Sequence, residues 1–291
     1  MLDASCLQYC ITDDERRHFQ ERGYLVVEDA LDEDTIRRLI AAVDRIDGAH
    51  RARTGMGPHD QTFFADFVGR DPAFTDLVDW PKTFPKVWGL LGWNIYLYHS
   101  HLGVNPPVVP EQRGQQKTLG WHQDSGRVNV EMEEHPRPRL SLKVGYFLTD
   151  LTTPGRGNFW IIPGSHRQDT LEKPADGVGN PPGAMPVCVR PGTAVFFDRR
   201  LWHSASPNTS ESSIRKVLFY GYGYRWIRPK DDMTIPDEVM ERADPIRRQL
   251  LGWATSANGR YSPTDADVPL RTWLREHRPE DAQNVVVADR N

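Results

Sequence analysis

The chain has 291 residues, of which 38% are hydrophobic and 26% charged, and its formal net charge is −4. These values are ordinary for a soluble globular protein and allow a sizeable buried core. The mild, mixed charge gives no reason to expect nucleic acid or an anionic membrane as partner, and no segment approaches the roughly 18 apolar residues of a membrane span. Three cysteines and no signal-peptide pattern argue against a disulfide framework and favour a cytoplasmic protein.

Residues 1–93 are expected to form a helical N-terminal flank. Thr12 and Glu15 form a capping-box pattern, which predicts a helix from Asp13 to about Arg22. A short strand at 24–27 should follow, and then a second helix that begins near residue 32. The apolar residues of this second helix follow the spacing of one buried face: Ile36, Leu39, Ile40 and Val43. A third helix is expected around 81–91.

Residues 94–226 have the pattern of short strands separated by Pro/Gly turns. The expected strands are 95–104, 140–146, 159–162, 194–197 and 217–224. Many short strands of this kind indicate a mainly β fold, a jelly roll with flanking helices, in preference to a parallel α/β sheet. A helical C-terminal flank and tail, with helical segments between 237 and 254, is expected over 227–291, and the whole chain, 1–291, is predicted to form one domain.

One segment of the β region has the residues of a metal site, Trp121-His122-Gln123-Asp124. On a strand, residues two apart point to the same face, so His122 and Asp124 can reach one ion. A lone His-x-Asp pair is weak evidence, and a third ligand is needed. His203, just after the expected strand 194–197, is the preferred candidate. His166, in a tight turn, is the main competitor and is interpreted as structural.

Two imidazoles and one carboxylate match the facial triad of non-haem Fe(II) oxygenases, which leaves three metal positions open. Two of these suit a bidentate 2-oxo acid and the third suits O₂. Such a co-substrate has a second carboxylate that needs a cation. Arg215, twelve residues after His203 and at the head of the expected strand 217–224, is the candidate, because a guanidinium binds a carboxylate in bidentate fashion.

In these residues and the motifs around them, the sequence resembles a known family, the phytanoyl-CoA dioxygenase-like branch of the 2-oxoglutarate oxygenases, which includes ectoine hydroxylases. The resemblance covers most of residues 12–226. Its most specific motifs are Trp121-His122-Gln123-Asp124, Gly157-Asn158-Phe159-Trp160-Ile161-Ile162-Pro163-Gly164-Ser165-His166, and the stretch from Pro191-Gly192 through Asp198 to Trp202-His203.

The resemblance implies a double-stranded β-helix core, Fe(II), 2-oxoglutarate and O₂, with the metal ligands His122, Asp124 and His203. It also implies a salt bridge from Arg215 to 2-oxoglutarate and, near the same co-substrate, Tyr146 and His99. The expected reaction is hydroxylation of an unactivated C–H bond, with release of succinate and CO₂. A carboxylate at position 124 favours hydroxylation over halogenation, while desaturation, epimerisation and ring formation stay open.

The sequence departs from the family pattern at two positions. Ala205 stands where a serine often follows the distal histidine, and Asn105 stands where many relatives have lysine. The first departure puts one hydrogen bond to 2-oxoglutarate in doubt. Neither affects the metal ligands.

Two other functions are compatible with parts of this pattern. A zinc-dependent hydrolase could use the same three ligands, but it would not need Arg215. A non-catalytic jelly-roll binding protein is disfavoured by the intact triad.

The aromatic content suggests a small organic substrate, such as a specialised metabolite. Candidate substrate residues are Arg127, Asn129, Phe63 and Phe64, together with the loop between 173 and 186. Arg127 could bind an acidic group of the substrate or pair with Glu131 or Glu133 nearby. The sequence does not indicate an oligomeric state.

Overall fold

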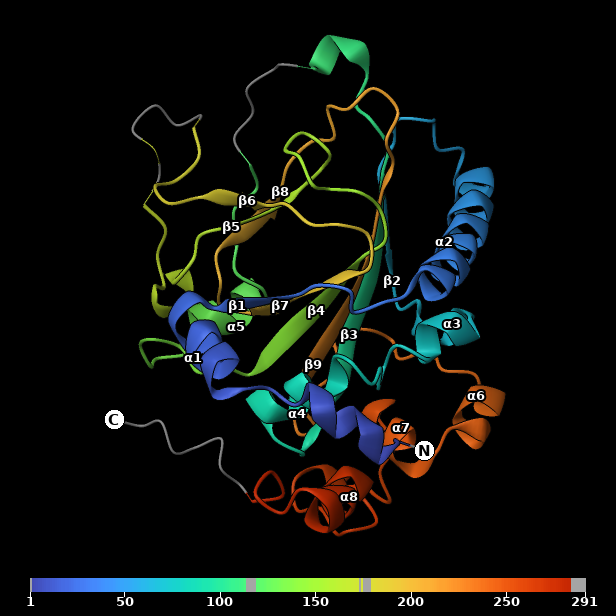
Figure 1. Cartoon of the computed structure of the whole chain (residues 1–291), viewed down its shortest axis with the longest axis vertical. Coiled ribbons are helices and arrows are strands. Elements are labelled where there is room, and N and C mark those ends of the chain that lie inside the picture. The colour runs from blue at the N-terminus through green and yellow to red at the C-terminus, as the bar shows by residue number, and fades with distance from the viewer. Residues whose placement is uncertain (1, 114–118, 173, 175–178, 284–291) are drawn as a thin grey trace.

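The computed structural model describes residues 2–113, 119–172, 174 and 179–283. Two antiparallel sheets form its centre, and Figure 1 shows the small sheet on one side of the large one. The large sheet has the strand order β1 (Tyr24–Val27), β7 (Thr193–Asp198), β4 (Ser141–Phe147), β9 (Arg215–Tyr224), β3 (Ile95–Asn105) and β2 (Thr62–Ala65). The small sheet has the order β6 (Met185–Val187), β5 (Phe159–Ile161) and β8 (His203–Ala205). This is the expected jelly-roll core.

An aromatic cluster packs the two sheets together. Phe159 of the small sheet lies 4.9 Å from Phe197 and 6.3 Å from Phe219 of the large sheet, measured between ring centroids. All three rings are buried. Because rings of this size each bury a large apolar area, the cluster fixes the separation of the sheets around the site.

Helices cover the other face of the large sheet (Figure 1). The α-helices are α1 (Asp13–Arg22), α2 (Glu33–Thr54), α3 (Pro72–Thr75), α4 (Phe84–Leu91), α5 (Gly126–Glu131), α6 (Asp237–Arg242), α7 (Pro245–Leu250) and α8 (Pro269–His277). Short 3-10 helices occur at Ala4–Tyr9, Val68–Arg70, Pro110–Gln112, Ser165–Arg167 and Asn258–Arg260. In the described residues, no helix is both long and apolar enough to cross a bilayer.

The alternation of side chains along β4 separates the site from the core. Leu142, Val144 and Tyr146 belong to the core cluster on the helix side of the sheet. Lys143 and Phe147 lie on the opposite side, where Phe147 joins the cluster between the sheets. This strand therefore decides which of its residues can reach a ligand between the sheets.

Several expected elements are confirmed, together with the residues at which they begin and end. The Thr12 and Glu15 side chains form a reciprocal capping box at the start of α1, and Gly23 ends this helix with a φ of 80°. The helical segments expected between 237 and 254 are present as α6 and α7. Asp244 caps α7, which has Pro245 in its first turn. Much of the expected C-terminal tail lies outside the described residues.

Candidate active site

The structure brings His122, Asp124 and His203 together between the two sheets. One ligand atom from each residue lies within 4.8 Å of the others. His203 begins β8, and its backbone N–H and C=O each pair with those of His122 at 3.0 Å. The expected strand at 122–124 is wrong, since His122 forms a single β-bridge there. That bridge, with the extended chain beside it, is enough to aim the three side chains at one point.

Backbone carbonyls orient both imidazoles. The Nδ1 of His122 lies 2.8 Å from the carbonyl oxygen of Gly120, and the Nδ1 of His203 lies 2.8 Å from that of Leu201. A carbonyl accepts only an N–H, so each Nδ1 is protonated and each Nε2 has a free lone pair. Burial lowers the pKa of His203 to about 4, which keeps its imidazole neutral, as a metal ligand must be.

Asp124 offers one free oxygen atom. Its Oδ1 accepts a hydrogen bond from Lys143 Nζ at 2.9 Å, and both side chains are only 5% exposed. Its Oδ2 is buried with no hydrogen-bond partner in the described structure. Burial alone would raise the pKa of Asp124, but the positive charge of Lys143 and its hydrogen bond hold that pKa well below its usual value. The free oxygen is therefore ionised and suited to a cation.

Sequence reasoning missed Lys143. The signal was a lysine in a strand whose other residues read as apolar or small, since a charge in a buried strand needs a partner. The partner is distant in sequence, so the pattern alone could not identify it.

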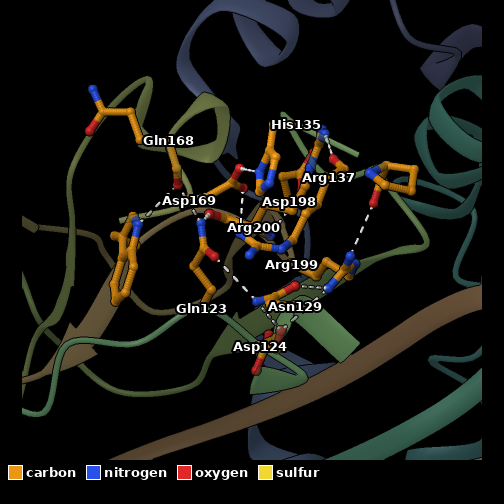
Figure 2. Close-up of polar contacts among 12 residues, drawn as sticks. Gln123, Asp124, Asn129, His135, Arg137, Gln168, Asp169, Asp198, Arg199 and Arg200 are labelled. Carbon is orange, nitrogen blue, oxygen red and sulfur yellow. Dashed lines mark hydrogen bonds and ion pairs between the residues drawn. The ribbon is translucent and has the colours of Figure 1, made fainter. Parts of the chain in front are cut away.

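A network of hydrogen bonds supports Asp124 from behind, as Figure 2 shows. Gln123 donates to the carbonyl of Arg200 at 2.5 Å and accepts from Asn129 at 3.2 Å. The guanidinium of Arg199, which is almost fully buried, donates to the Asn129 side-chain oxygen at 2.7 Å. The backbone N–H of Asp124 donates to the carbonyl of Arg199 at 2.8 Å. The 122–124 segment is thus bonded to the turn between β7 and β8.

Arg215 lies in the same cavity as a buried cation without an acid. Its Nη1 donates to the side-chain oxygen of Asn105 at 2.7 Å, and its Nε has no partner. Its guanidinium carbon lies 5.8 Å from the centre of the Phe147 ring. No carboxylate pairs with it in the described residues, and burial lowers its pKa to about 10. The departure noted at Asn105 thus provides the acceptor that fixes Arg215.

His99 and His101 lie side by side on the cavity wall. His99 Nδ1 lies 2.6 Å from the Asp231 carboxylate, and its Nε2 lies 3.3 Å from Nδ1 of His101. The His101 ring is stacked between Phe63 and Phe219, at centroid distances of 4.5 and 4.6 Å. Burial lowers the pKa of both histidines. The wall therefore presents two neutral, fixed imidazoles.

The cavity has a volume of about 900 Å³ and contains the triad, His99 and Arg215. Phe63 and Arg127, two of the candidate substrate residues, also line it. Arg127 additionally pairs with Glu131, the alternative considered for it. Residues 173 and 175–178 of the candidate substrate loop lie outside the described residues.

Three expected site residues lie elsewhere. Tyr146 is on the helix side of β4, where its hydroxyl lies 2.6 Å from that of Thr83, so a contact with 2-oxoglutarate is wrong. Phe64 packs against the helix-side core because it alternates with Phe63 along β2. Asn129 faces the Asp124 network described above. His166, the rejected ligand candidate, is buried with its Nε2 3.0 Å from the Gln20 carbonyl oxygen.

Comparison with known proteins agrees with this geometry. The family model for phytanoyl-CoA dioxygenase (PhyH) matches residues 19–217. The chain belongs to this family. The match includes all three triad residues and every strand of both sheets except most of β9. This PhyH protein is thus a non-haem iron dioxygenase that uses Fe(II), 2-oxoglutarate and O₂. Family membership favours this class over the zinc hydrolase and the non-catalytic binding protein.

Individual relatives of this PhyH protein are distant. It is 25% identical to the dioxygenase trt7 of Aspergillus terreus, over 84% of this chain and 85% of that one. It is 24% identical to an ectoine dioxygenase of Sphingopyxis alaskensis, over 65% of this chain and 69% of that one.

Solved structures share the fold. HygX from Streptomyces hygroscopicus, with nickel and 2-oxoglutarate bound, has a TM-score of 0.58 at 15% identity and covers 76% of this chain and 90% of its own. The α-ketoglutarate-dependent carbocyclase SnoK from nogalamycin biosynthesis has a TM-score of 0.56 at 23% identity and covers 81% of this chain and 92% of its own.

Proposed function

We propose that His122, Asp124 and His203 bind Fe(II) and that the enzyme hydroxylates a C–H bond of a small organic molecule. The observation that supports this proposal is the set of free donor atoms between the sheets. Two imidazole Nε2 atoms and one buried, unpartnered carboxylate oxygen converge there. These donors are the ones a facial iron site requires, and they leave metal positions open for the co-substrates.

Arg215 is proposed to bind the distal carboxylate of 2-oxoglutarate. Within the described part of the chain its buried guanidinium has an unsatisfied N–H and no acidic partner, which is costly, and a dianionic co-substrate would satisfy it. Asn105 holds the guanidinium in place. His99 lines the same cavity and is proposed to lie near this co-substrate, with its ring orientation set by Asp231.

The chain's own residues orient and shield the reaction. With 2-oxoglutarate and O₂, iron supplies the oxidation of a substrate C–H bond, coupled to formation of succinate and CO₂. Lys143 holds one oxygen of Asp124 so that the other faces the ion site. Asp124 occupies the position that a halide would need, so hydroxylation is favoured over halogenation. HygX has been solved with hygromycin B bound, and SnoK is named as a carbocyclase. A small-molecule substrate is likewise proposed here.

Anaerobic titration tests the metal and co-substrate sites. The apoprotein is titrated with Fe(II) and then 2-oxoglutarate, while the weak visible charge-transfer band of a chelated 2-oxo acid is recorded. We expect a band in the wild type, no band in His203→Ala, and a band that needs far more 2-oxoglutarate in Arg215→Ala. Arg190→Ala, at a surface arginine paired with Glu28, is the control and should titrate like the wild type. No band at saturating iron and 2-oxoglutarate would refute the proposed site.

A further inference from the structure

The charges that line the cavity are unbalanced. Five cationic side chains line it, and Asp124 is the one carboxylate among its described lining residues. The cations are Arg127, Lys143, Arg215, Arg228 and Lys230. Lys143 is paired with Asp124, and Arg127 is paired with Glu131. Among the residues that the structure describes, neither Arg228 nor Lys230 forms a salt bridge.

Loading the site does not remove this excess. Divalent iron and dianionic 2-oxoglutarate cancel each other in charge, and Asp124 cancels Lys143. Arg215, Arg228 and Lys230 then remain positive. Asp231, which lies behind the wall on His99, offsets one of these charges. A cavity that stays positive after iron and 2-oxoglutarate are bound attracts one more anion.

The two unpaired cations belong to a loop that is fixed to the sheet. This loop follows β9, and the backbone N–H of Lys230 donates to the carbonyl of Tyr98 in β3 at 2.8 Å. The Arg228 and Lys230 residues are exposed to solvent. Both residues also line the cavity, so a ligand bound beside the triad can reach them.

An exposed apolar surface lies in the same cavity. Phe63 is 66% exposed although it is a large aromatic side chain, and it stacks on His101. Val128 and Ile227 line the cavity as well. An exposed apolar surface next to convergent cations is typical of a site for an amphipathic ligand.

We propose that the substrate is an organic acid with an apolar body. Its anionic group binds Arg228 and Lys230, and its body lies against Phe63. This inference rests on the proposed function, because it assigns the substrate of the same cavity. It narrows the substrate from any small organic molecule to an anion.

Two fluorescent dyes with one shared body test this assignment. Anilinonaphthalene sulfonate and its neutral parent, phenylnaphthylamine, differ by one anionic group. Each is titrated into enzyme loaded with Ni(II) and 2-oxoglutarate, in which nickel prevents turnover. We expect the sulfonate to bind about tenfold more tightly than the neutral dye, the ratio that about 1.4 kcal/mol gives. The double variant Arg228→Gln/Lys230→Met should lose this preference.

Matched controls separate the possible outcomes. Lys82→Met removes a lysine that donates to the Asp29 carbonyl outside the cavity, and it should keep the wild-type preference. The single variants Arg228→Gln and Lys230→Met should each lose part of the preference for the anionic dye. They keep the assignment testable if the double variant does not fold. Equal binding of the two dyes by the wild type, no binding of either, or a preference that survives in the double variant would overturn the assignment.

The iron and 2-oxoglutarate titration is independent of the dyes. A protein that shows the charge-transfer band but no preference for the anion overturns the substrate class alone. A protein without the band overturns the proposed function itself.

Discussion

Replacing Lys143 by methionine should destabilise the metal-free protein strongly. The Lys143 and Asp124 side chains are each 5% exposed, and their atoms lie 2.9 Å apart. Removing one partner of a buried ion pair costs about 3–5 kcal/mol, because the remaining charge is uncompensated. At about 2 °C per kcal/mol for a chain of this size, the Tm should fall by roughly 6–10 °C. The assay is thermal unfolding in the presence of a chelator.

A divalent metal should reverse most of that loss. Bound to Asp124, it supplies the positive charge that Lys143 provided, so Co(II) or Ni(II) should raise the Tm more in Lys143→Met than in the wild type. Lys86→Met is the matched control, since Lys86 is a buried lysine paired with Glu15 at 2.7 Å away from the triad. Its deficit should not depend on metal. Equal metal stabilisation of Lys143→Met and the wild type would refute this reasoning.

Three further predictions follow from the placement of single side chains. Tyr146→Phe removes the hydroxyl that is hydrogen-bonded to Thr83, so it should lower the free energy of unfolding by about 1 kcal/mol and leave the KM for 2-oxoglutarate unchanged. A tenfold higher KM in steady-state assays would contradict the placement of Tyr146 on the helix side of the sheet. Asn105→Ala frees Arg215 and should raise that KM roughly tenfold, whereas an unchanged KM would show that Asn105 does not position it. Between about pH 6.5 and 4, His203 binds a proton in the unfolded metal-free chain but not in the folded protein, where it is buried. The free energy of unfolding should therefore decrease by up to roughly 3 kcal/mol as the pH is lowered through this range. Urea unfolding at several pH values checks this, and His203→Gln should flatten the dependence.

Local signals predicted the elements well. The start of α1 depends on a reciprocal bond between Thr12 and Glu15, and both partners stand within four residues of sequence. The proposed metal ligands could also be named from sequence, because the His-x-Asp pair and His203 are chemically distinctive. Arg215 could be proposed from its position on the strand after His203.

Roles that depend on partners distant in sequence could not be predicted from such local signals. Tyr146 and Lys143 stand three apart on β4, and the face of each follows from the packing of helices and sheets that the strand alone does not specify. Asn129 follows the metal segment in sequence, yet its partners Gln123 and Arg199 turn it away from the cavity. The short strands β6 and β8 have three residues each, too few for a period to be recognised.

The backbone pairing of His122 with His203 has a consequence for what happens when the enzyme loses its iron. The backbone bonds between these residues, and that from Asp124 to the Arg199 carbonyl, are formed by the polypeptide itself. The geometry for chelation is therefore part of the folded chain, in contrast to small zinc domains that fold only around their ion. Loss of iron should leave a folded protein ready for reloading. Its catalytic capacity should then follow the iron supply reversibly, without new synthesis of the chain.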